Sequence, residues 1–217
     1  MILRLPLLFL VAILLHISTR PVQGADKPGK SIALRLLACE VTQDPPKVYL
    51  ETTGGKSDEF DLPSSAFTAP IEVSHREVVL KAPGNDVPMS DIIIPDQGRT
   101  FAVLLAPKDP EGFTPTVLRL DDNSFKPGDY HFVNLSKETL VLKLGDTEVV
   151  VEAGASVKSR PSGPLGSGFC KVIMSTRSES GDKIFASTRW LMANPKRGYV
   201  IFTARSNGKI TYRAVDE

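Results

Sequence analysis

The sequence has few of the residues that catalytic and metal sites most often use. Its 217 residues include three histidines, two cysteines and one tryptophan. One histidine lies in the apolar amino-terminal segment, which leaves only His75 and His131 in the rest of the chain. Two histidines exclude a three-histidine zinc site and leave a catalytic triad few options for its base. We therefore expect no metal and no cofactor.

The chain also lacks an excess of either charge. It has 26 lysines and arginines and 25 aspartates and glutamates, a formal net charge of +1. Nucleic-acid-binding proteins usually carry a clear basic excess, so no nucleic-acid partner is expected. Acidic residues are slightly more frequent in residues 25–120 and basic residues in residues 121–217. Ordinary surface variation explains this difference, although complementary halves could also pack on each other or on neighbouring copies.

The first 24 residues have the pattern of a secretory signal peptide. Arg4 precedes the apolar run Leu5–Ile17, which is 13 residues long. A membrane-spanning helix needs about 20 apolar residues, whereas the apolar part of a signal peptide needs about 7 to 15. We predict cleavage after Gly24 and an exported protein, periplasmic or extracellular, without a stable membrane span. The alternative is an uncleaved anchor that tethers the protein to the membrane.

The two cysteines, Cys39 and Cys170, leave two alternatives open. An oxidising compartment would permit a disulfide between them. Both lie in apolar, strand-like runs, so buried free thiols explain them equally well. Residues 36–39 resemble a lipoprotein box, but basic residues separate them from the signal-like segment, and we do not expect lipidation.

The apolar residues follow the pattern of an all-β protein. Short runs of valine, isoleucine, leucine, phenylalanine and tyrosine are bounded every 8 to 12 residues by turn formers, and no helical stripe is present. This pattern predicts antiparallel β-sandwiches. Gly145-Asp146 predicts a tight hairpin turn in which Gly145 takes a positive φ. The predicted strands are 32–39, 47–52, 77–82, 100–106, 130–135, 139–144, 148–152, 169–175 and 199–204.

An internal similarity predicts two tandem Ig-like modules. Residues 95–106 resemble residues 195–204 at an offset of 98, with Arg99 on Arg197 and Phe101 on Tyr199. This similarity favours a diverged duplication, although two unrelated β domains with shared turn chemistry could mimic it. The predicted domains are 1–24 (signal peptide), 25–122 (first sandwich), 123–128 (linker) and 129–217 (second sandwich). Because the linker is short, the modules should pack against each other.

Candidate catalytic residues are weakly indicated. Asp129 and His131 are two positions apart and would share a strand face, so they could serve as acid and base. No Gly-x-Ser-x-Gly motif supplies a nucleophile, and a surface pair explains them more simply. Residues 121–123 could offer oxygen ligands to calcium, but a turn at a strand end explains these residues just as well.

Candidate binding residues surround one glycine-rich loop, residues 161–168. Arg160, Lys196 and Arg197 could give a surface near this loop a positive charge. The only tryptophan, Trp190, is expected in the core or as a cation–π cap. Residues 134–136 spell an N-glycosylation sequon, which we interpret as the end of a strand.

The second half resembles a group of small exported β-sandwich proteins of planctomycete and verrucomicrobial bacteria. The segments that carry the resemblance are 128–136, 143–145, 187–190 and 197–202. Over the Val-Asn-Leu-Ser hairpin, the chain is also distantly similar to Ig-like envelope modules, including accessory proteins of exopolysaccharide modification. The resemblance implies a periplasmic or cell-surface setting and assigns no functional residue.

Two functions are therefore open. The first is a non-catalytic envelope or extracellular protein with a structural role or a binding role, whose partner is an envelope protein or a polysaccharide. The second is a periplasmic hydrolase or transferase that uses Asp129 and His131, which predicts a concave pocket around these two residues.

Overall fold

The computed structural model describes residues 31–40, 44–108, 112–162, 168–191, 196–205 and 207–217. The predicted signal peptide, residues 1–24, lies outside the described residues. All regular elements in the described ranges are β-strands. Within these ranges no helix has the length and apolar character needed to cross a membrane.

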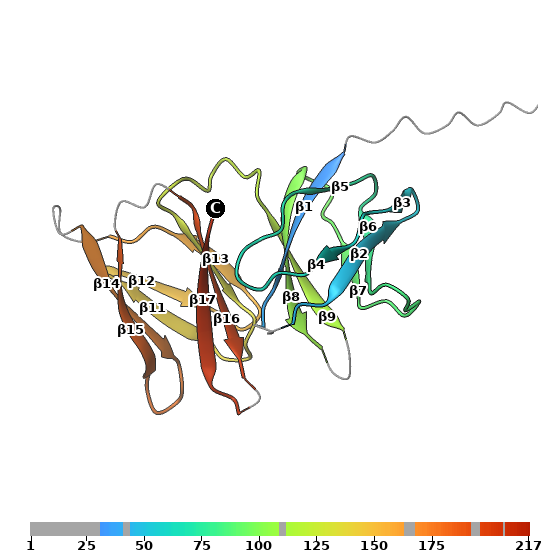
Figure 1. The fold of residues 1–217 in the computed structure, drawn as a ribbon. Helices are drawn as coiled ribbons and strands as arrows, with labels where there is room; N and C mark the ends of the chain where they lie inside the picture. Colours follow the sequence, from blue (N-terminus) through green and yellow to red (C-terminus); the bar gives the residue numbers. More distant parts are fainter. Residues whose placement is uncertain (1–30, 41–43, 109–111, 163–167, 192–195, 206) are drawn as a thin grey trace, which may run out of the picture.

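The first sandwich consists of two sheets (Figure 1). Its inner sheet has the order β5-β1-β8-β9, with β1 (Ile32–Ala38), β5 (Ile71–Val73), β8 (Thr100–Pro107) and β9 (Phe113–Arg119). Its outer sheet has the order β3-β2-β6-β7, with β4 also paired to β2. The outer strands are β2 (Lys47–Thr52), β3 (Gly55–Lys56), β4 (Phe60–Asp61), β6 (Glu77–Lys81) and β7 (Ser90–Ile93).

The second sandwich also has an inner and an outer sheet. The inner order is β13-β10-β16-β17, with β10 (Tyr130–Asn134), β13 (Ser156–Ser159), β16 (Gly198–Ala204) and β17 (Ile210–Asp216). The outer order is β12-β11-β14-β15, with β11 (Leu140–Leu144), β12 (Thr147–Val151), β14 (Phe169–Thr176) and β15 (Lys183–Leu191). The predicted hairpin is confirmed, because β11 pairs with β12 across Gly145, whose φ is 63°.

The two sandwiches have the same strand order when β4 is set aside. In each, the first strand of the half pairs in parallel with the second-last strand, as β1 with β8 and β10 with β16. The remaining described ladders between strands of each sheet are antiparallel. The prediction of an all-β sandwich fold is thus confirmed. Descent of both halves from one ancestral unit stays a prediction.

The predicted offset of 98 residues between the halves is wrong. Phe101 on β8 packs inside the first sandwich, whereas Tyr199 on β16 faces the other sandwich. A shift by one residue exchanges the two faces of a strand. Val200 and Phe202 point into the core of the second sandwich as Phe101 points into the core of the first. They are odd numbers of residues from Phe101, whereas the predicted offset is even.

A third apolar cluster joins the inner sheets of the two sandwiches, so the molecule has four layers (Figure 1). We call this cluster the interface core. Its buried members are Leu37, Cys39, Phe67, Ala102, Leu104, Leu118, Leu120, Phe125, Val133, Tyr199, Ile201 and Val215. Burial of a large apolar side chain contributes roughly 1.5 to 3 kcal/mol, so this cluster couples the two sandwiches strongly.

Candidate anion-binding pocket

A polar pocket of about 610 Å³ opens at one end of the first sandwich. It lies where β1 begins, where β9 ends and where the connections before β6 and β8 meet. Three of its eight lining residues are arginines. The lining residues are Ile32, Ser74, Arg76, Asp96, Gly98, Arg99, Arg119 and Asp121.

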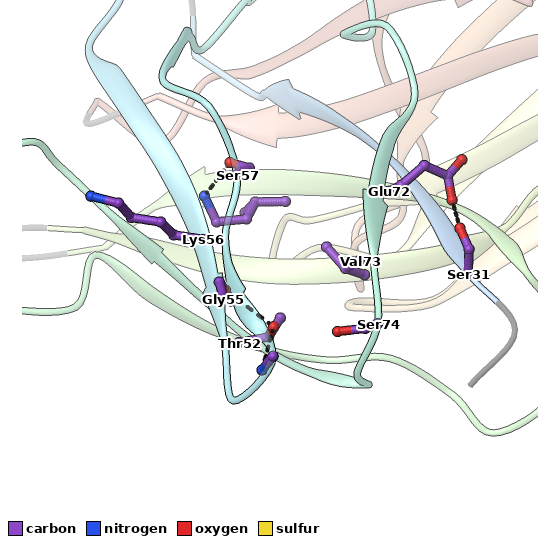
Figure 2. Close-up of a pocket in the computed structure, with 10 residues that line it drawn as sticks. Ser31, Thr52, Gly55, Lys56, Ser57, Glu72, Val73 and Ser74 are labelled. Atoms are coloured by element: carbon purple, nitrogen blue, oxygen red, sulfur yellow. Dashed lines mark hydrogen bonds between the residues drawn. The ribbon is translucent and has the colours of Figure 1, made fainter. Parts of the chain in front are cut away.

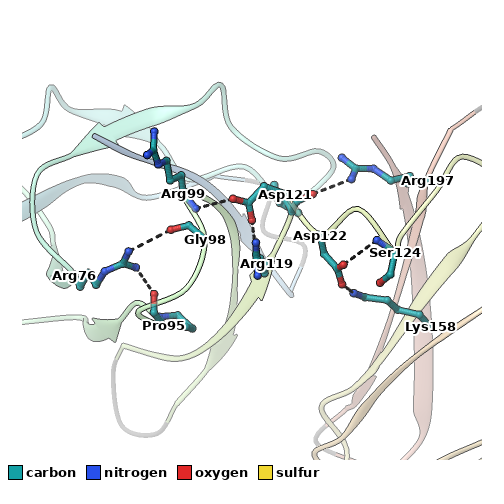
Figure 3. A network of polar contacts seen from close by, with 11 residues as sticks. Arg76, Pro95, Gly98, Arg99, Arg119, Asp121, Asp122, Ser124, Lys158 and Arg197 are labelled. Carbon is teal, nitrogen blue, oxygen red and sulfur yellow. Dashed lines mark hydrogen bonds and ion pairs between the residues drawn. The ribbon is translucent and has the colours of Figure 1, made fainter. Parts of the chain in front are cut away.

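Arg76 holds the loop that forms one wall of the pocket. Its guanidinium group donates to the carbonyl oxygens of Pro95 and Gly98 (Figure 3). Gly98 has a φ of 105°, and a Cβ atom there would lie 2.9 Å from both Arg119 Nε and Asp121 Oδ1. Glycine is therefore required at this position, both for its backbone conformation and for the space that the ion pair occupies.

Asp121 orients a second arginine. Its Oδ1 accepts from Arg119 Nε at 2.6 Å, and its Oδ2 accepts from the backbone N–H of Arg99 at 2.8 Å (Figure 3). Partial burial raises the pKa of Asp121, but these hydrogen bonds outweigh it and lower the pKa below the ordinary value. The carboxylate is thus ionised at neutral pH, and it fixes the Arg119 side chain at the pocket wall.

The guanidinium group of Arg99 is available to a ligand. Its side chain is exposed, and it has no hydrogen-bond or ion-pair partner within the described part of the chain. The ion pair of Arg119 with Asp121 uses only Nε of the guanidinium group, and the Arg119 side chain is 45% exposed. The lining carries three arginines against the carboxylates of Asp96 and Asp121. Planar guanidinium groups bind carboxylate, phosphate and sulfate groups through paired hydrogen bonds.

A second cavity, of about 280 Å³, shares Ser74 with the first. Residues of β2, β3 and β5 and of the segments next to β1 and β3 line it, including the hydroxyl groups of Ser31, Thr52 and Ser57 and the charged side chains of Lys56 and Glu72 (Figure 2). Ser57 Oγ accepts from the backbone N–H of Leu50 at 3.0 Å, which ties the turn to β2. A ligand that spans both cavities would meet arginines at one end and hydroxyl groups, with Lys56 and Glu72, at the other.

Two of the three predicted binding residues, Arg160 and Lys196, contact the linker or the residue after it and line neither of these two pockets. Arg160 Nε donates to Asp129 Oδ1 at 2.7 Å, and Arg160 Nη2 donates to the carbonyl oxygen of Pro127 at 3.0 Å. Lys196 is exposed, and its carbonyl oxygen accepts from the N–H of Gly128. Neither Lys196 nor Arg160 lines either pocket, and loop residues 163–167 lie outside the described residues.

Arg197 connects the two sandwiches. It donates to the carbonyl oxygen of Leu120 at 2.8 Å (Figure 3) and to Glu217 Oε2 at 2.7 Å. Its guanidinium carbon lies 5.4 Å from the ring centroid of Phe125. The Arg197 side chain is 23% exposed, so these contacts leave little of it for a ligand.

The predicted acid–base pair of Asp129 and His131 is not formed. The Asp129 carboxylate accepts from Arg160 and from the backbone N–H of Lys126. His131 Nε2 lies 3.1 Å from Ser156 Oγ instead. Neither Asp129 nor His131 lines either of the two pockets, so the concave site predicted around them is not observed there.

His131 makes the stability of the protein depend on pH. Burial and, to a smaller extent, the charge of Lys158 lower its pKa from 6.5, Asp122 opposes the shift, and together they place the pKa of His131 at about 4. The unfolded chain therefore binds a proton more readily than the folded protein. We expect the free energy of unfolding to fall by about 3 kcal/mol between pH 6.5 and pH 4 and to level off below pH 4, where the folded protein also takes up the proton.

Urea unfolding at several pH values measures this effect. The control is His131→Phe, which keeps an aromatic ring beside Phe125 and Tyr199 but cannot titrate. Ser156, which loses its hydrogen bond to the imidazole in this variant, is exposed, and its hydroxyl group can bond to water instead. An equal pH slope in both proteins between pH 6.5 and pH 4 would contradict the assignment.

The two cysteines are buried free thiols, so the disulfide that the sequence would permit is not formed. Cys39 lies in the interface core and Cys170 in the core of the second sandwich. Burial raises the pKa of Cys39 to about 11 and also raises the pKa of Cys170. Protonated, buried thiols are poor nucleophiles.

The calcium alternative for residues 121–123 is not supported. Asp121 binds Arg119, and Asp122 binds Lys158 and the backbone N–H of Ser124 (Figure 3). The described residues contain no group of three or more potential metal-ligating side chains. The acidic residues fix the strand end and the start of the linker, as the turn interpretation predicts.

Trp190 and Asn134 are structural. Trp190 stacks on Tyr130 at a centroid distance of 4.7 Å and on Phe132 at 6.0 Å, which confirms its expected place at the core. Asn134 is fully buried, so its amide nitrogen cannot accept a glycan in the folded protein. The sequon residues form the end of strand β10 and the turn after it, in agreement with the interpretation of residues 134–136 as a strand end.

The pocket arginines are not identified by sequence reasoning as a site. Arg76, Arg99 and Arg119 are spread over three separate segments and belong to no motif. Only the β-sandwich fold brings them to one end of the same module. A comparison of the sequence with protein-family models and with curated proteins finds no match, so the function has to be inferred from this site.

Proposed function

We propose that the protein is an exported, non-catalytic binding protein that captures acidic polysaccharide of the cell envelope. The observation that carries this proposal is the exposed Arg99 guanidinium group, unpartnered among the described residues, in a pocket of about 610 Å³. A carboxylate or sulfate group of the polymer would bind Arg99 and the outer nitrogen atoms of Arg119. The predicted signal peptide supports a location where such polymers occur.

The pocket is preorganised for this role. Asp121 holds Arg119, and two loop carbonyl groups hold Arg76, so binding of an anion requires little ordering of these two side chains. The adjoining cavity is lined by the hydroxyl groups of Ser31 and Thr52. Ser31 donates to Glu72 and Thr52 donates to the carbonyl oxygen of Gly55, so each hydroxyl oxygen can act toward a ligand only as an acceptor, through a remaining lone pair. Hydroxyl groups of this kind can bond to the sugar hydroxyls that follow the acidic group along a polymer.

Isothermal titration calorimetry with polygalacturonate tests the proposal, with neutral dextran as the comparison polymer. Arg99→Gln should weaken the binding of polygalacturonate by roughly 10-fold or more, because a hydrogen bond to a charged group contributes about 1.5 to 3 kcal/mol. The matched control is Arg205→Gln, since Arg205 is an exposed arginine of the second sandwich that lines neither pocket. Equal binding of both polymers, or unchanged affinity of Arg99→Gln, would refute the proposal.

A further inference from the structure

Two cations without a partner among the described residues lie side by side on the outer sheet of the second sandwich. Lys171 on β14 is directly opposite Arg189 on β15, and both side chains are exposed. Neither has a hydrogen-bond or ion-pair partner among the described residues. Like charges directly opposite each other destabilise a sheet, so folding of a single chain does not explain this pair.

Exposed apolar side chains adjoin these cations. Phe169 and Leu191 are the next directly opposed pair on the same face, and they are 55% and 44% exposed. Exposed apolar groups rimmed by charged residues often mark a contact surface. We call Phe169, Lys171, Arg189 and Leu191 the basic patch.

The outer sheet of the first sandwich carries a complementary surface. Glu77 on β6 is directly opposite Ile93 on β7, whose side chain is 75% exposed. Asp91 lies two residues from Ile93 on the same face and is also exposed. Neither Glu77 nor Asp91 has an ion-pair partner within the described ranges. We call Glu77, Asp91 and Ile93 the acidic patch.

The two patches occupy equivalent places in the two sandwiches. Strands β6 and β7 are the last two strands in the order of one outer sheet, with β7 at the edge. Strands β14 and β15 hold the same two positions in the other outer sheet, with β15 at the edge. The outer sheets form the opposite ends of the four-layer molecule (Figure 1). The patches of one molecule therefore cannot meet each other, but each can meet the opposite patch of a second molecule.

We infer that the basic patch of one molecule binds the acidic patch of a second copy, which joins the copies head to tail. Each contact pairs Lys171 and Arg189 with Glu77 and Asp91 and covers exposed Ile93, Phe169 and Leu191. Contacts between two basic or two acidic patches are disfavoured by repulsion. A head-to-tail contact leaves one patch of each kind exposed, so the assembly extends into chains or closes into a ring.

Sedimentation velocity measures this self-association directly. The average sedimentation coefficient of the wild-type protein should rise with protein concentration at an ionic strength of about 0.05 M and fall back at about 0.5 M, because salt screens exposed charges. A wild-type protein that stays monomeric at millimolar concentration and low salt would overturn the inference.

Two charge-reversed variants identify the surfaces. Lys171→Glu with Arg189→Glu, and Glu77→Lys with Asp91→Lys, should each lower the association constant at least 10-fold. A mixture of the two variants should associate again, because the first retains a native acidic patch and the second a native basic patch. Association of either variant alone at the wild-type level, or a mixture that stays monomeric, would overturn the inference.

A control variant separates this contact from a general effect of charge. Arg205→Glu with Lys209→Glu makes the same change in net charge as reversal of the basic patch, at exposed positions of the β16–β17 connection. It should associate like the wild-type protein. An equal loss of association in this control would show that net charge, and not the patch, governs assembly.

Discussion

Asn134→Asp is expected to destabilise the protein by at least about 4 kcal/mol, enough to leave much of it unfolded. The Asn134 side chain is fully buried, and its Nδ2 group lies 2.7 to 3.1 Å from three carbonyl oxygens. These oxygens belong to Glu138, Val151 and Glu152. A carboxylate would face them without a proton to donate, in a site that water does not reach.

Urea unfolding measures this loss, with Trp190 fluorescence as the probe of the second sandwich. Asn134→Ala should cost less than Asn134→Asp, because it leaves the carbonyl groups unpaired without adding a charge. The milder control is Ser136→Ala, which removes only the hydroxyl that donates to Asn134 Oδ1 at 2.7 Å, for about 1 kcal/mol. Stability of Asn134→Asp within 1 kcal/mol of the wild type would contradict the role given to the amide.

Tyr199→Ala is expected to lower the free energy of unfolding by about 3 to 5 kcal/mol. Tyr199 is fully buried in the interface core, where its ring meets Phe67 at 5.5 Å and Phe125 at 5.4 Å in edge-to-face geometry. Phe67 belongs to the first sandwich, so the substitution opens a cavity between the two sandwiches. The loss should weaken their coupling as well as their total stability.

Two comparisons separate the ring from the hydroxyl group. Tyr199→Phe keeps the ring and removes the hydrogen bond to Glu217 Oε2 at 2.9 Å, so it should cost only about 1 kcal/mol. Tyr49→Ala is the control on the outer sheet, where the side chain is only half-buried, and it should cost less than Tyr199→Ala. Unfolding curves from Trp190 fluorescence and from circular dichroism should coincide in the wild type. A loss at Tyr199→Ala no larger than that at Tyr199→Phe would contradict the interface role.

The interface core also explains why several candidate site residues are structural. Arg197 was singled out for its charge, yet it connects Leu120, Phe125 and Glu217 at the boundary between the sandwiches. His131 lies against the same aromatic cluster. Charge and residue type predict that such side chains need partners, but only packing decides whether those partners belong to the protein or to a ligand.

The sequence by itself determined the fold class. Turn formers at regular spacing divided the chain into short strands, and the glycine at Gly145 set the hairpin between β11 and β12, because both are local properties of the backbone. The predicted linker, residues 123–128, lies between β9, which ends at Arg119, and β10, which begins at Tyr130. The shortest strands, β3, β4, β5, β7 and β13, were not predicted, because two to four residues carry too little periodicity. Strand β15, which has nine residues, was also absent from the predicted ranges.

Only the tertiary structure decided which face each strand presents and which charges meet. The apolar residues of β8 and β16 are buried on both faces, so no alternation in the sequence marks the side that meets the other sandwich, and the predicted offset failed there. The pocket is a second case. Arg99 and Arg119 flank the paired strands β8 and β9, whereas Arg76 precedes β6 of the other sheet and reaches them through its hydrogen bonds to the Pro95 and Gly98 carbonyl oxygens, a contact that no local pattern in the sequence marks.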